Sequence, residues 1–377
     1  MNRRERLMAT LHGETVDRPP VSFYEINGYD EHPEDPDPFN IYSDPSWLPL
    51  IQIAAEKTDR ILMRRLAFSD VLPDPLEELS KETVLEKDGS RFGVRSIQAG
   101  DRTLTSRTRR DPDLDTVWTI EHLLKDTDDL RAFIQIPTLA IGGAPNISPV
   151  LETERAIGDS GIVMIDTPDP LCLAAMLFDM ADYTVIASTE NLLFRQLLDW
   201  FASVLIPRTE AVAKALPGRL WRIYGPEYAS PPYLRPKLFR EYVCEYVGPM
   251  VEIIHRYGGY ARIHSHGNLK GILEDIISMN PDGLDPIEPP PQGDVELREV
   301  RDKYGKELVL FGNLEVSDIE TLPTDLFAER VKRALEEGTA GEGRGFVLMP
   351  SAAPYGRKLS SLTLKNYEKM IELVESF

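Results

Sequence analysis

The sequence predicts an α/β fold: a (β/α)8 TIM barrel with an antiparallel hairpin insertion after the second strand. Short apolar runs alternate with helical patterns over most of the 377 residues, and this alternation favours a parallel sheet. We count eight such units, the number that closes a barrel. A barrel of this class with an insertion accounts for the whole chain, so we predict one domain over residues 1–377.

The eight predicted strands are short apolar runs, each followed by residues that can form a helix. In chain order they cover residues 20–25, 60–64, 161–166, 220–224, 260–264, 283–287, 308–311 and 346–349. The clearest helix covers residues 236–257, where apolar side chains recur at helical spacing until Gly258-Gly259 ends it. Further helices are expected over residues 190–216, 324–337 and 362–377.

One region, at about residues 76–119, breaks this alternation. Apolar residues there recur with a period of two, and Asp88-Gly89 separates two such runs, which is typical of a β-hairpin. A further run at residues 103–109 is expected to pair with this hairpin. The segment therefore predicts an antiparallel insertion after the second barrel strand.

Composition excludes several classes of protein. Acidic residues outnumber basic ones by 62 to 42, giving a net charge of −20, and no basic stripe of the kind that nucleic acids or anionic membranes attract is present. No segment approaches the ~20 apolar residues of a membrane span, and no signal peptide is recognisable. The two cysteines, Cys172 and Cys244, are far apart and predict buried thiols. We expect a cytoplasmic protein.

The most informative segment runs from Arg262 to Gly267, at the end of the fifth predicted strand. Successive side chains of a strand point to opposite faces, so His264 and His266 are expected to share one face. In a barrel of parallel strands, that end carries the active site. Two of only six histidines therefore predict a metal site or an acid/base site.

Polar side chains follow the other predicted strands at the same end of the barrel, where we expect them to surround one pocket. We assign catalytic roles to Glu227 and Asp166, and substrate binding to Glu25, Tyr29, Arg64 and Asn313. Strand ends lead into polar loops in any case, so each of these residues has an ordinary structural alternative.

Neutral imidazole binds zinc well, and a catalytic zinc needs three protein ligands and an open position. His264 and His266 supply two ligands, and no cysteine is placed to be the third. Glu288 and Glu227, on the neighbouring units, are the candidates for it, with Glu288 preferred. The alternative is that one histidine packs against the loop while the other binds substrate without a metal.

Several segments resemble the uroporphyrinogen decarboxylase superfamily. The resemblance lies in residues 4–21, in 264–268 (His-Ser-His-Gly-Asn), in 283–290 (Gly-Leu-Asp-Pro-Ile-Glu-Pro-Pro), in 293–295, in 311–314 (Phe-Gly-Asn-Leu), and in 345–349 with Asn366. It covers nearly the whole chain and implies a (β/α)8 barrel.

The segment after the first strand separates the two branches of this superfamily. True uroporphyrinogen decarboxylases carry an arginine-rich segment there, whereas this chain has Glu25 to Tyr29, and an acid there disfavours a polycarboxylate substrate. The chain is more similar to the zinc-dependent methyltransferases that use corrinoid cofactors. Their metal motif is His-x-Cys with a distant cysteine. Here His264 matches, His266 replaces the first cysteine, and Ser351 marks the region of the second.

The resemblance therefore implies a zinc-dependent methyltransferase. A methyl group would pass between a small methylated compound, such as an O-methyl substrate, and a corrinoid (cobalamin) cofactor on a partner protein. The family also suggests a homodimer. Two alternatives remain open. One is a metal-free decarboxylase or lyase with the histidines as acid and base and Arg64 or Arg65 as carboxylate anchor, and the other is a barrel that binds a small ligand without turnover.

Overall fold

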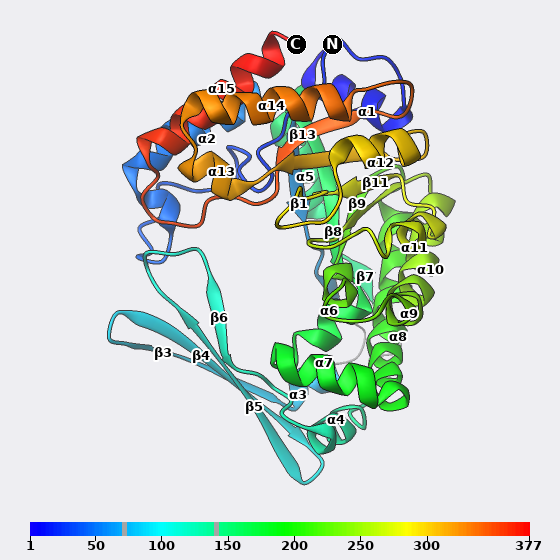
Figure 1. The fold of residues 1–377 in the computed structure, drawn as a ribbon. Coiled ribbons are helices and arrows are strands. Elements are labelled where there is room, and N and C mark those ends of the chain that lie inside the picture. The colour runs from blue at the N-terminus through cyan, green and yellow to red at the C-terminus, as the bar shows by residue number, and fades with distance from the viewer. Residues whose placement is uncertain (70–73, 139–142) are drawn as a thin grey trace.

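The computed structural model describes residues 1–69, 74–138 and 143–377. Its central element is a curled sheet of seven strands in the order β1-β8-β9-β10-β11-β12-β13, in which every neighbouring pair is parallel (Figure 1). The strands are β1 Arg60–Arg64, β8 Gly161–Pro168, β9 Leu220–Tyr224, β10 Tyr260–His264, β11 Gly283–Asp285, β12 Val309–Leu314 and β13 Phe346–Pro350. The barrel-like α/β architecture and seven of the eight predicted strands are thus confirmed.

The first predicted strand, at residues 20–25, is not a regular strand in the structure. It forms only isolated bridges, one of which joins Val21 in parallel to Leu348 of β13. The Val21 carbonyl also accepts a hydrogen bond from the Asp59 N–H, just before β1, so the segment lies between the two edges of the sheet. Pro19 and Pro20 lack the N–H groups that a ladder needs, and Tyr24 has a φ of 59°, which ends extended pairing.

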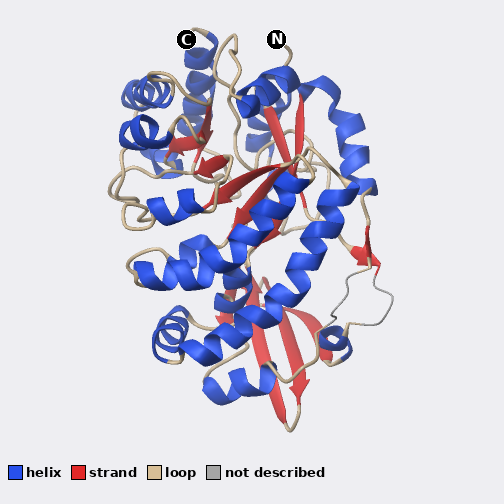
Figure 2. Ribbon diagram, turned by 90° about the vertical axis from the view of Figure 1, so that its right-hand side faces the viewer, coloured by secondary structure: helices blue, strands red, loops and turns tan. Residues whose placement is uncertain are grey.

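Helices cover the outer face of this sheet (Figure 2). They include the predicted helices at 190–216, 324–337 and 362–377, whereas the helix predicted at 236–257 is divided into α9, a π-helical turn at Arg240–Cys244, and α10. The helices are α1 Arg3–His12, α2 Leu48–Lys57, α3 Pro75–Glu78, α4 Thr127–Phe133, α5 Ser148–Ile157, α6 Pro170–Ala175, α7 Met180–Thr189, α8 Asn191–Ala215, α9 Pro236–Phe239, α10 Glu245–Arg256, α11 Leu273–Ser278, α12 Leu297–Tyr304, α13 Val316–Thr321, α14 Thr324–Gly338 and α15 Ser361–Glu375.

Two apolar cores follow from this arrangement. The larger core lies between sheet and helices and contains Leu62, Val163, Ile223 and Ile263. The smaller one contains alternate strand residues such as Met164, Phe311 and Met349 with Leu7 and Leu11 of α1. Because side chains alternate along a strand, the second set faces the inside of the curled sheet. The polar groups discussed below extend from this inner face.

The insertion predicted at 76–119 is antiparallel, as expected, but larger than a hairpin. It is a four-stranded sheet of β3 Ser80–Lys87, β4 Ser90–Ala99, β5 Arg102–Arg110 and β6 Val117–Glu121. The strands that precede and follow this sheet in the sequence, β2 Phe68–Ser69 and β7 Ala144–Pro145, form a separate small antiparallel pair. Both cysteines are free, and Cys172 is buried as predicted.

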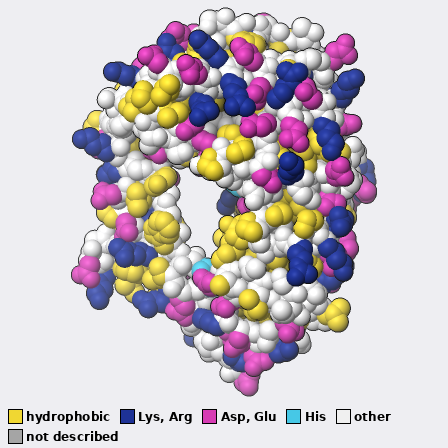
Figure 3. All heavy atoms as spheres, viewed as in Figure 1, with side chains coloured by type: hydrophobic (Ala, Val, Ile, Leu, Met, Phe, Trp, Pro, Cys, Tyr) yellow, Lys and Arg dark blue, Asp and Glu magenta, His cyan; other side chains and the backbone are white. Residues whose placement is uncertain are grey.

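The four-stranded sheet is attached to the rest of the molecule at both ends. At one end Ile97 and Leu104 are buried in the larger core near α4. At the other, the Asp115 N–H donates to the Tyr355 carbonyl and the Arg357 N–H donates to the Asp113 carbonyl, both at 2.8 Å. Figure 3 shows the opening that remains between the sheet and the barrel-like body. No helix in the described ranges is long and apolar enough to span a membrane.

Candidate functional site

His264 and His266 lie together at the carboxyl end of β10. Their ring centroids are 4.6 Å apart and the ring planes are perpendicular. The His264 ring is buried and stacks on Tyr24 with centroids 6.0 Å apart, whereas His266 is about one-third exposed. The two imidazoles therefore occupy one place, as expected from their spacing, with His266 on the accessible side.

A buried ion pair holds His264 in position. Its Nδ1 lies 2.6 Å from Asp285 Oδ2, and Asp285 also accepts two hydrogen bonds from the buried guanidinium of Arg262. Burial favours the neutral form of Asp285, but the charges of Arg262 and His264 outweigh it and keep the pKa of this carboxyl well below its ordinary value. The ionised carboxylate therefore fixes Nδ1 as the protonated nitrogen and leaves Nε2 free to accept.

Glu288 binds Nδ1 of His266 as Asp285 binds Nδ1 of His264. Its Oε1 lies 2.7 Å from Nδ1 of His266, and its Oε2 accepts a hydrogen bond from the Gly267 N–H at 2.7 Å. Burial alone would raise the pKa of Glu288 and lower that of His266. The hydrogen bond and mutual attraction outweigh burial, so the pKa of Glu288 is lowered and that of His266 is raised. Glu288 therefore fixes Nδ1 of His266 as a protonated nitrogen, and both of its carboxylate oxygens are in use.

Glu227 lines the same pocket as His266. The pocket has a volume of about 330 Å³ and is also bordered by Tyr228, Tyr233 and Gln292. Glu227 is half-buried, and its Oε2 accepts a hydrogen bond from the Gly225 N–H at 3.0 Å. Its other oxygen is available to a ligand in this pocket.

Asp166 is fixed between two arginines and, with Arg65, lines a pocket that His266 does not border. Its Oδ1 accepts from Arg222 Nε at 2.7 Å and its Oδ2 from Arg65 Nε at 3.0 Å. Burial alone would lower the pKa of the Arg222 guanidinium. Its interactions with Tyr24 and Asp166 are stronger than this effect, so the pKa lies above its ordinary value. Arg65 stays largely exposed above the Tyr224 ring, so Asp166 orients a guanidinium towards solvent at the strand ends.

The predicted substrate-binding residues near the first two strands lie in two places. Glu25 is accessible to solvent, yet burial by the surrounding protein raises the pKa of its carboxyl group. The charges of Arg222, His264 and Asp166 also act on this pKa, so Glu25 faces the inner cavity. Tyr29 and Arg64 lie on the outer side: Arg64 binds Asp30 at 2.9 Å and Thr153 of α5 at 2.9 Å, with its guanidinium 5.7 Å from the Tyr29 ring centre.

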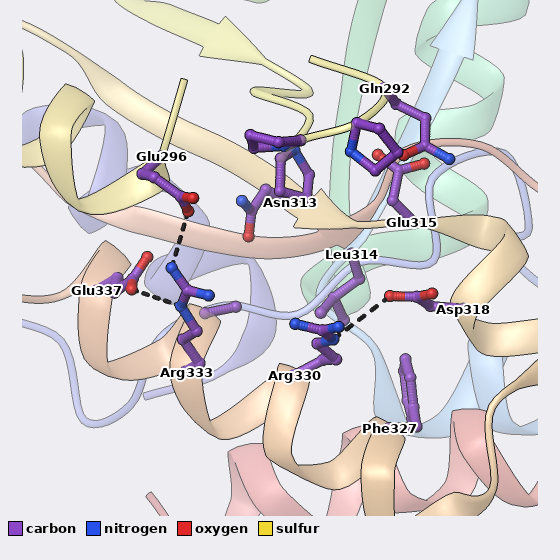
Figure 4. Close-up of a pocket in the computed structure, with 14 residues that line it drawn as sticks. Gln292, Glu296, Asn313, Leu314, Glu315, Asp318, Phe327, Arg330, Arg333 and Glu337 are labelled. Atoms are coloured by element: carbon purple, nitrogen blue, oxygen red, sulfur yellow. Dashed lines mark hydrogen bonds and ion pairs between the residues drawn. The ribbon is translucent and has the colours of Figure 1, made fainter. Parts of the chain in front are cut away.

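Asn313 lines a second pocket, of about 200 Å³, between the proline-rich loop after Glu288 and helices α13 and α14 (Figure 4). Its Nδ2 donates to the Ile287 carbonyl at 3.3 Å. Glu315 borders the same pocket, and its pKa is raised to about 7, first by burial and then by the charge of Glu288. Gln292 borders both pockets, so the two are separated by one short loop.

The donor atoms are of the kind that binds a metal ion, but the described side chains do not surround one point. Both histidines present Nε2 atoms whose Nδ1 partners are carboxylates, the arrangement found around bound zinc. The buried Oε1 of Glu315 has no hydrogen-bond partner in the part of the chain that the structure describes. However, within residues 1–69, 74–138 and 143–377 no group of three or more histidine, cysteine, aspartate or glutamate side chains is close enough to hold a metal ion.

Sequence reasoning left several of these residues unassigned. Arg222, Arg262 and Asp285 form a buried ionic layer, and Glu315 directly follows β12. One signal was present, because each member of the layer interrupts an apolar strand. Arg222 lies laterally beside Arg262, and His264 beside Asp285. Charged residues in adjacent buried strands indicate an internal ion-pair network.

Comparison with known proteins agrees with this geometry. The family described as uroporphyrinogen decarboxylase (URO-D) matches residues 158–376. No curated protein matches the chain. Among solved structures, a methyltransferase from Methanosarcina mazei is similar over 99% of each chain, with 18% identity and a TM-score of 0.59, which shows a shared fold. A D-psicose 3-epimerase from Clostridium cellulolyticum H10 is less similar: its TM-score is 0.35 at 11% identity, over 60% of this chain and 82% of that one.

Proposed function

The chain belongs to the uroporphyrinogen decarboxylase family, and from that premise we propose that it is a methyltransferase. The proposed reaction moves a methyl group between a small methylated compound, with an O-methyl ether as the favoured class, and a corrinoid on a partner protein. The single observation that carries the proposal is the pair of imidazoles, 4.6 Å apart, whose Nδ1 atoms are both held by carboxylates. Such a pair presents two lone-pair nitrogens to one small volume.

Two further observations support methyl transfer over decarboxylation of a porphyrinogen. The solved structure that is similar over 99% of both chains is a methyltransferase. In addition, Glu25 faces the inner cavity, where a polycarboxylate substrate would require cations. The raised pKa of Glu25 shows that this place already disfavours one negative charge.

The chain's own residues divide the work in the proposed mechanism. Asp285 and Glu288 hold the two imidazoles with Nε2 outwards, and Glu227 offers a carboxylate oxygen in the pocket of His266. Zinc, held by His264 and His266 with Glu227 as third ligand, would supply a Lewis acid that polarises the substrate's heteroatom. The other candidate from the sequence, Glu288, already binds Nδ1 of His266 and the Gly267 N–H. A reduced corrinoid on the partner protein would supply the nucleophile that accepts the methyl group, and the ether oxygen would keep the electron pair of the O–CH3 bond and take a proton from water.

Substrate binding in the proposal falls to groups around this centre. Asp166 aims the Arg65 guanidinium at the strand ends, and Glu25 and Asn313 border the inner cavity and the adjoining pocket. Tyr29 and Arg64 belong to the outer rim, where they stabilise the loop that carries Glu25. We further propose that the protein acts in the cytoplasm as a homodimer, which size-exclusion chromatography with light scattering would test.

Metal analysis of freshly purified protein tests the metal part of this proposal. We expect zinc near one per chain, and its loss in the His264→Ala/His266→Ala double variant. His32→Ala is the matched control, because His32 is exposed and its ion pair among the described residues is with Glu34. Native protein without metal, or a double variant that keeps it, would contradict the zinc assignment.

Methyl transfer is tested separately with a reduced corrinoid and a panel of small methyl ethers. We expect the absorption spectrum of the corrinoid to change to that of its methylated form, and no change with the double variant. A protein that releases carbon dioxide from small carboxylic acids and leaves the corrinoid unchanged would instead be the metal-free lyase. The exposed Arg65 guanidinium beside Asp166 is the observation that favours this second candidate, because it can anchor a carboxylate.

A further inference from the structure

We propose that the pocket of about 200 Å³ between the proline-rich loop and α14 binds a small organic ammonium ion, with Glu315 as its anionic anchor (Figure 4). The ligand class is a primary amine on a short apolar body. None of the residues that line this pocket is a proposed zinc ligand, so binding here does not depend on the metal.

Glu315 is buried at this pocket without a structural task. It occupies the N-cap position of α13, yet its side chain makes no capping hydrogen bond. Only 8% of the residue is exposed, its Oε2 accepts a 3.3 Å hydrogen bond from Ser351 Oγ, and its buried Oε1 has no partner among the described residues. A buried carboxylate oxygen left unpaired costs free energy, so this atom is expected to accept a hydrogen bond from a ligand.

A second acceptor lies on the same side of the strand. Asn313 precedes Glu315 by two residues at the end of β12, and both side chains line the pocket. The Nδ2 of Asn313 donates to the Ile287 carbonyl at 3.3 Å, so its Oδ1 remains as an acceptor for a ligand. Two acceptors on one side of a strand suit a ligand with several N–H donors, and an ammonium group has that character.

The charges around the pocket favour a cation over an anion. Arg333 donates to Glu296 at 2.8 Å and to Glu337 at 2.7 Å, and Arg330 lies 3.7 Å from Asp318. Both guanidinium groups of the lining therefore have carboxylate partners, whereas Glu315 forms no ion pair within the described ranges. The charge left over in the pocket is negative, and the net charge of −20 on the chain attracts cations from solution.

Apolar walls give the ligand its carbon body. The side chains of Leu314 and Phe327 are buried and line the pocket on one side, and Pro289, Pro290 and Pro291 line it on the other. A cavity of about 200 Å³ suits a chain of a few carbon atoms. An amine with such a chain places its ammonium group at the two acceptors and its carbon atoms between these walls.

The site is one loop away from the histidine pair. Gln292 borders both pockets, and the loop begins at Glu288, which binds His266. A Cβ at Gly293 would lie 2.0 Å from the Glu288 carbonyl oxygen, so the turn that closes this loop is tight. A ligand in the pocket of Glu315 therefore does not occupy the pocket of His266.

An NMR titration of the full-length protein at pH 8 tests this inference with n-butylamine, 1-butanol and butyrate. Burial and the charge of Glu288 raise the pKa of Glu315 to about 7, so at pH 8 its carboxylate is mostly ionised while the amine is still protonated. We expect saturable binding of the amine, about tenfold tighter than that of the alcohol, and no binding of butyrate. Equal binding of the amine and the alcohol, or a preference for butyrate, would overturn the ammonium site.

The Glu315→Gln variant tests the anchor. It should weaken amine binding about tenfold with unchanged circular dichroism, because a hydrogen bond to a charged group is lost. Glu320→Gln is the matched control, since Glu320 is on the same helix but does not line the pocket, and its affinity should be native. Native affinity in Glu315→Gln would remove Glu315 from the site.

A variant that gains affinity keeps the test decisive if Glu315→Gln is unstable. Arg330→Gln removes an exposed positive charge from the pocket and should tighten amine binding about twofold, whereas Arg298→Gln, which alters an exposed pair with Asp302 outside the pocket, should not. Unchanged or weaker binding in Arg330→Gln would contradict the charge argument. Protein that binds the amine but no zinc would overturn the zinc assignment alone, and protein that binds zinc but no amine would overturn this site alone.

Discussion

Among single residues, Glu315 has the strongest link to pH. Its pKa in the folded protein is about 7, against an ordinary value of 4.5. A carboxyl group whose pKa rises on folding is held protonated by the native state. Its contribution is fully present below the unfolded pKa and is lost as pH rises towards 7, because the unfolded chain then releases the proton more readily.

We therefore predict that Glu315→Gln changes the pH profile of stability in metal-free protein. The variant and the native protein should have the same free energy of unfolding at pH 4. At pH 8 the variant should be more stable by on the order of 2 kcal/mol, because glutamine never ionises. Chemical denaturation at a series of pH values measures the difference. Parallel profiles for the two proteins would show that Glu315 does not titrate in this range.

The histidine pair shows what could be predicted at the residue scale and what could not. Strand alternation was sufficient to bring His264 and His266 together, and the rings are 4.6 Å apart. Their carboxylate partners depend on lateral register, since Asp285 lies beside His264 on the next strand. Register is set by packing across the sheet, which a single sequence does not display.

At the scale of elements, the ends of the strands decide where functional side chains lie. Seven strands appear within a few residues of their predicted bounds because their apolar runs are short and well separated. The helix predicted at 236–257 is interrupted by the π-helical turn Arg240–Cys244. A single wide turn changes hydrogen-bond register while apolar spacing on either side persists, so periodicity alone does not reveal it.

Gly225 is the element boundary with the clearest consequence for the site. It ends β9 with a φ of +122°, and a Cβ there would lie 2.3 Å from Asp169 Oδ1 and 2.4 Å from Cys172 Cβ. The close approach of β9 and α6 therefore requires glycine. It also places the N–H that holds Glu227.

We predict that Gly225→Ala lowers the free energy of unfolding by about 2–4 kcal/mol, through both backbone strain and steric contact. Gly100→Ala is the control, because Gly100 also has positive φ but no atoms within 4 Å of the added methyl group, so about 1 kcal/mol is expected. Urea denaturation of both variants measures the two effects. Equal losses would mean that the contact with α6 does not matter.

At the scale of the whole molecule, the antiparallel sheet and the barrel-like body form a closed frame around the opening seen in Figure 3. The Arg357 side chain ties one corner of it, with Nε donating to the Pro112 carbonyl at 2.8 Å and the guanidinium also bonding Pro38 and Ser43. The period-two pattern predicted the antiparallel strands, but this closure joins residues more than 200 positions apart, which no local pattern encodes.

We predict that Arg357→Ala loosens the frame without unfolding the barrel. Loss of hydrogen bonds to a charged group should lower stability by about 1.5–3 kcal/mol and speed hydrogen exchange in β5 and β6. Arg298→Ala removes an exposed pair with Asp302 and should change both quantities little. Exchange rates in β5 and β6 that stay at native values would show that the backbone bonds at Asp113 and Asp115 suffice.

Because the four-stranded sheet is anchored to the barrel-like body at both ends, widening the opening between them requires one of these attachments to break. At one end these attachments include the backbone hydrogen bonds at Tyr355 and Arg357.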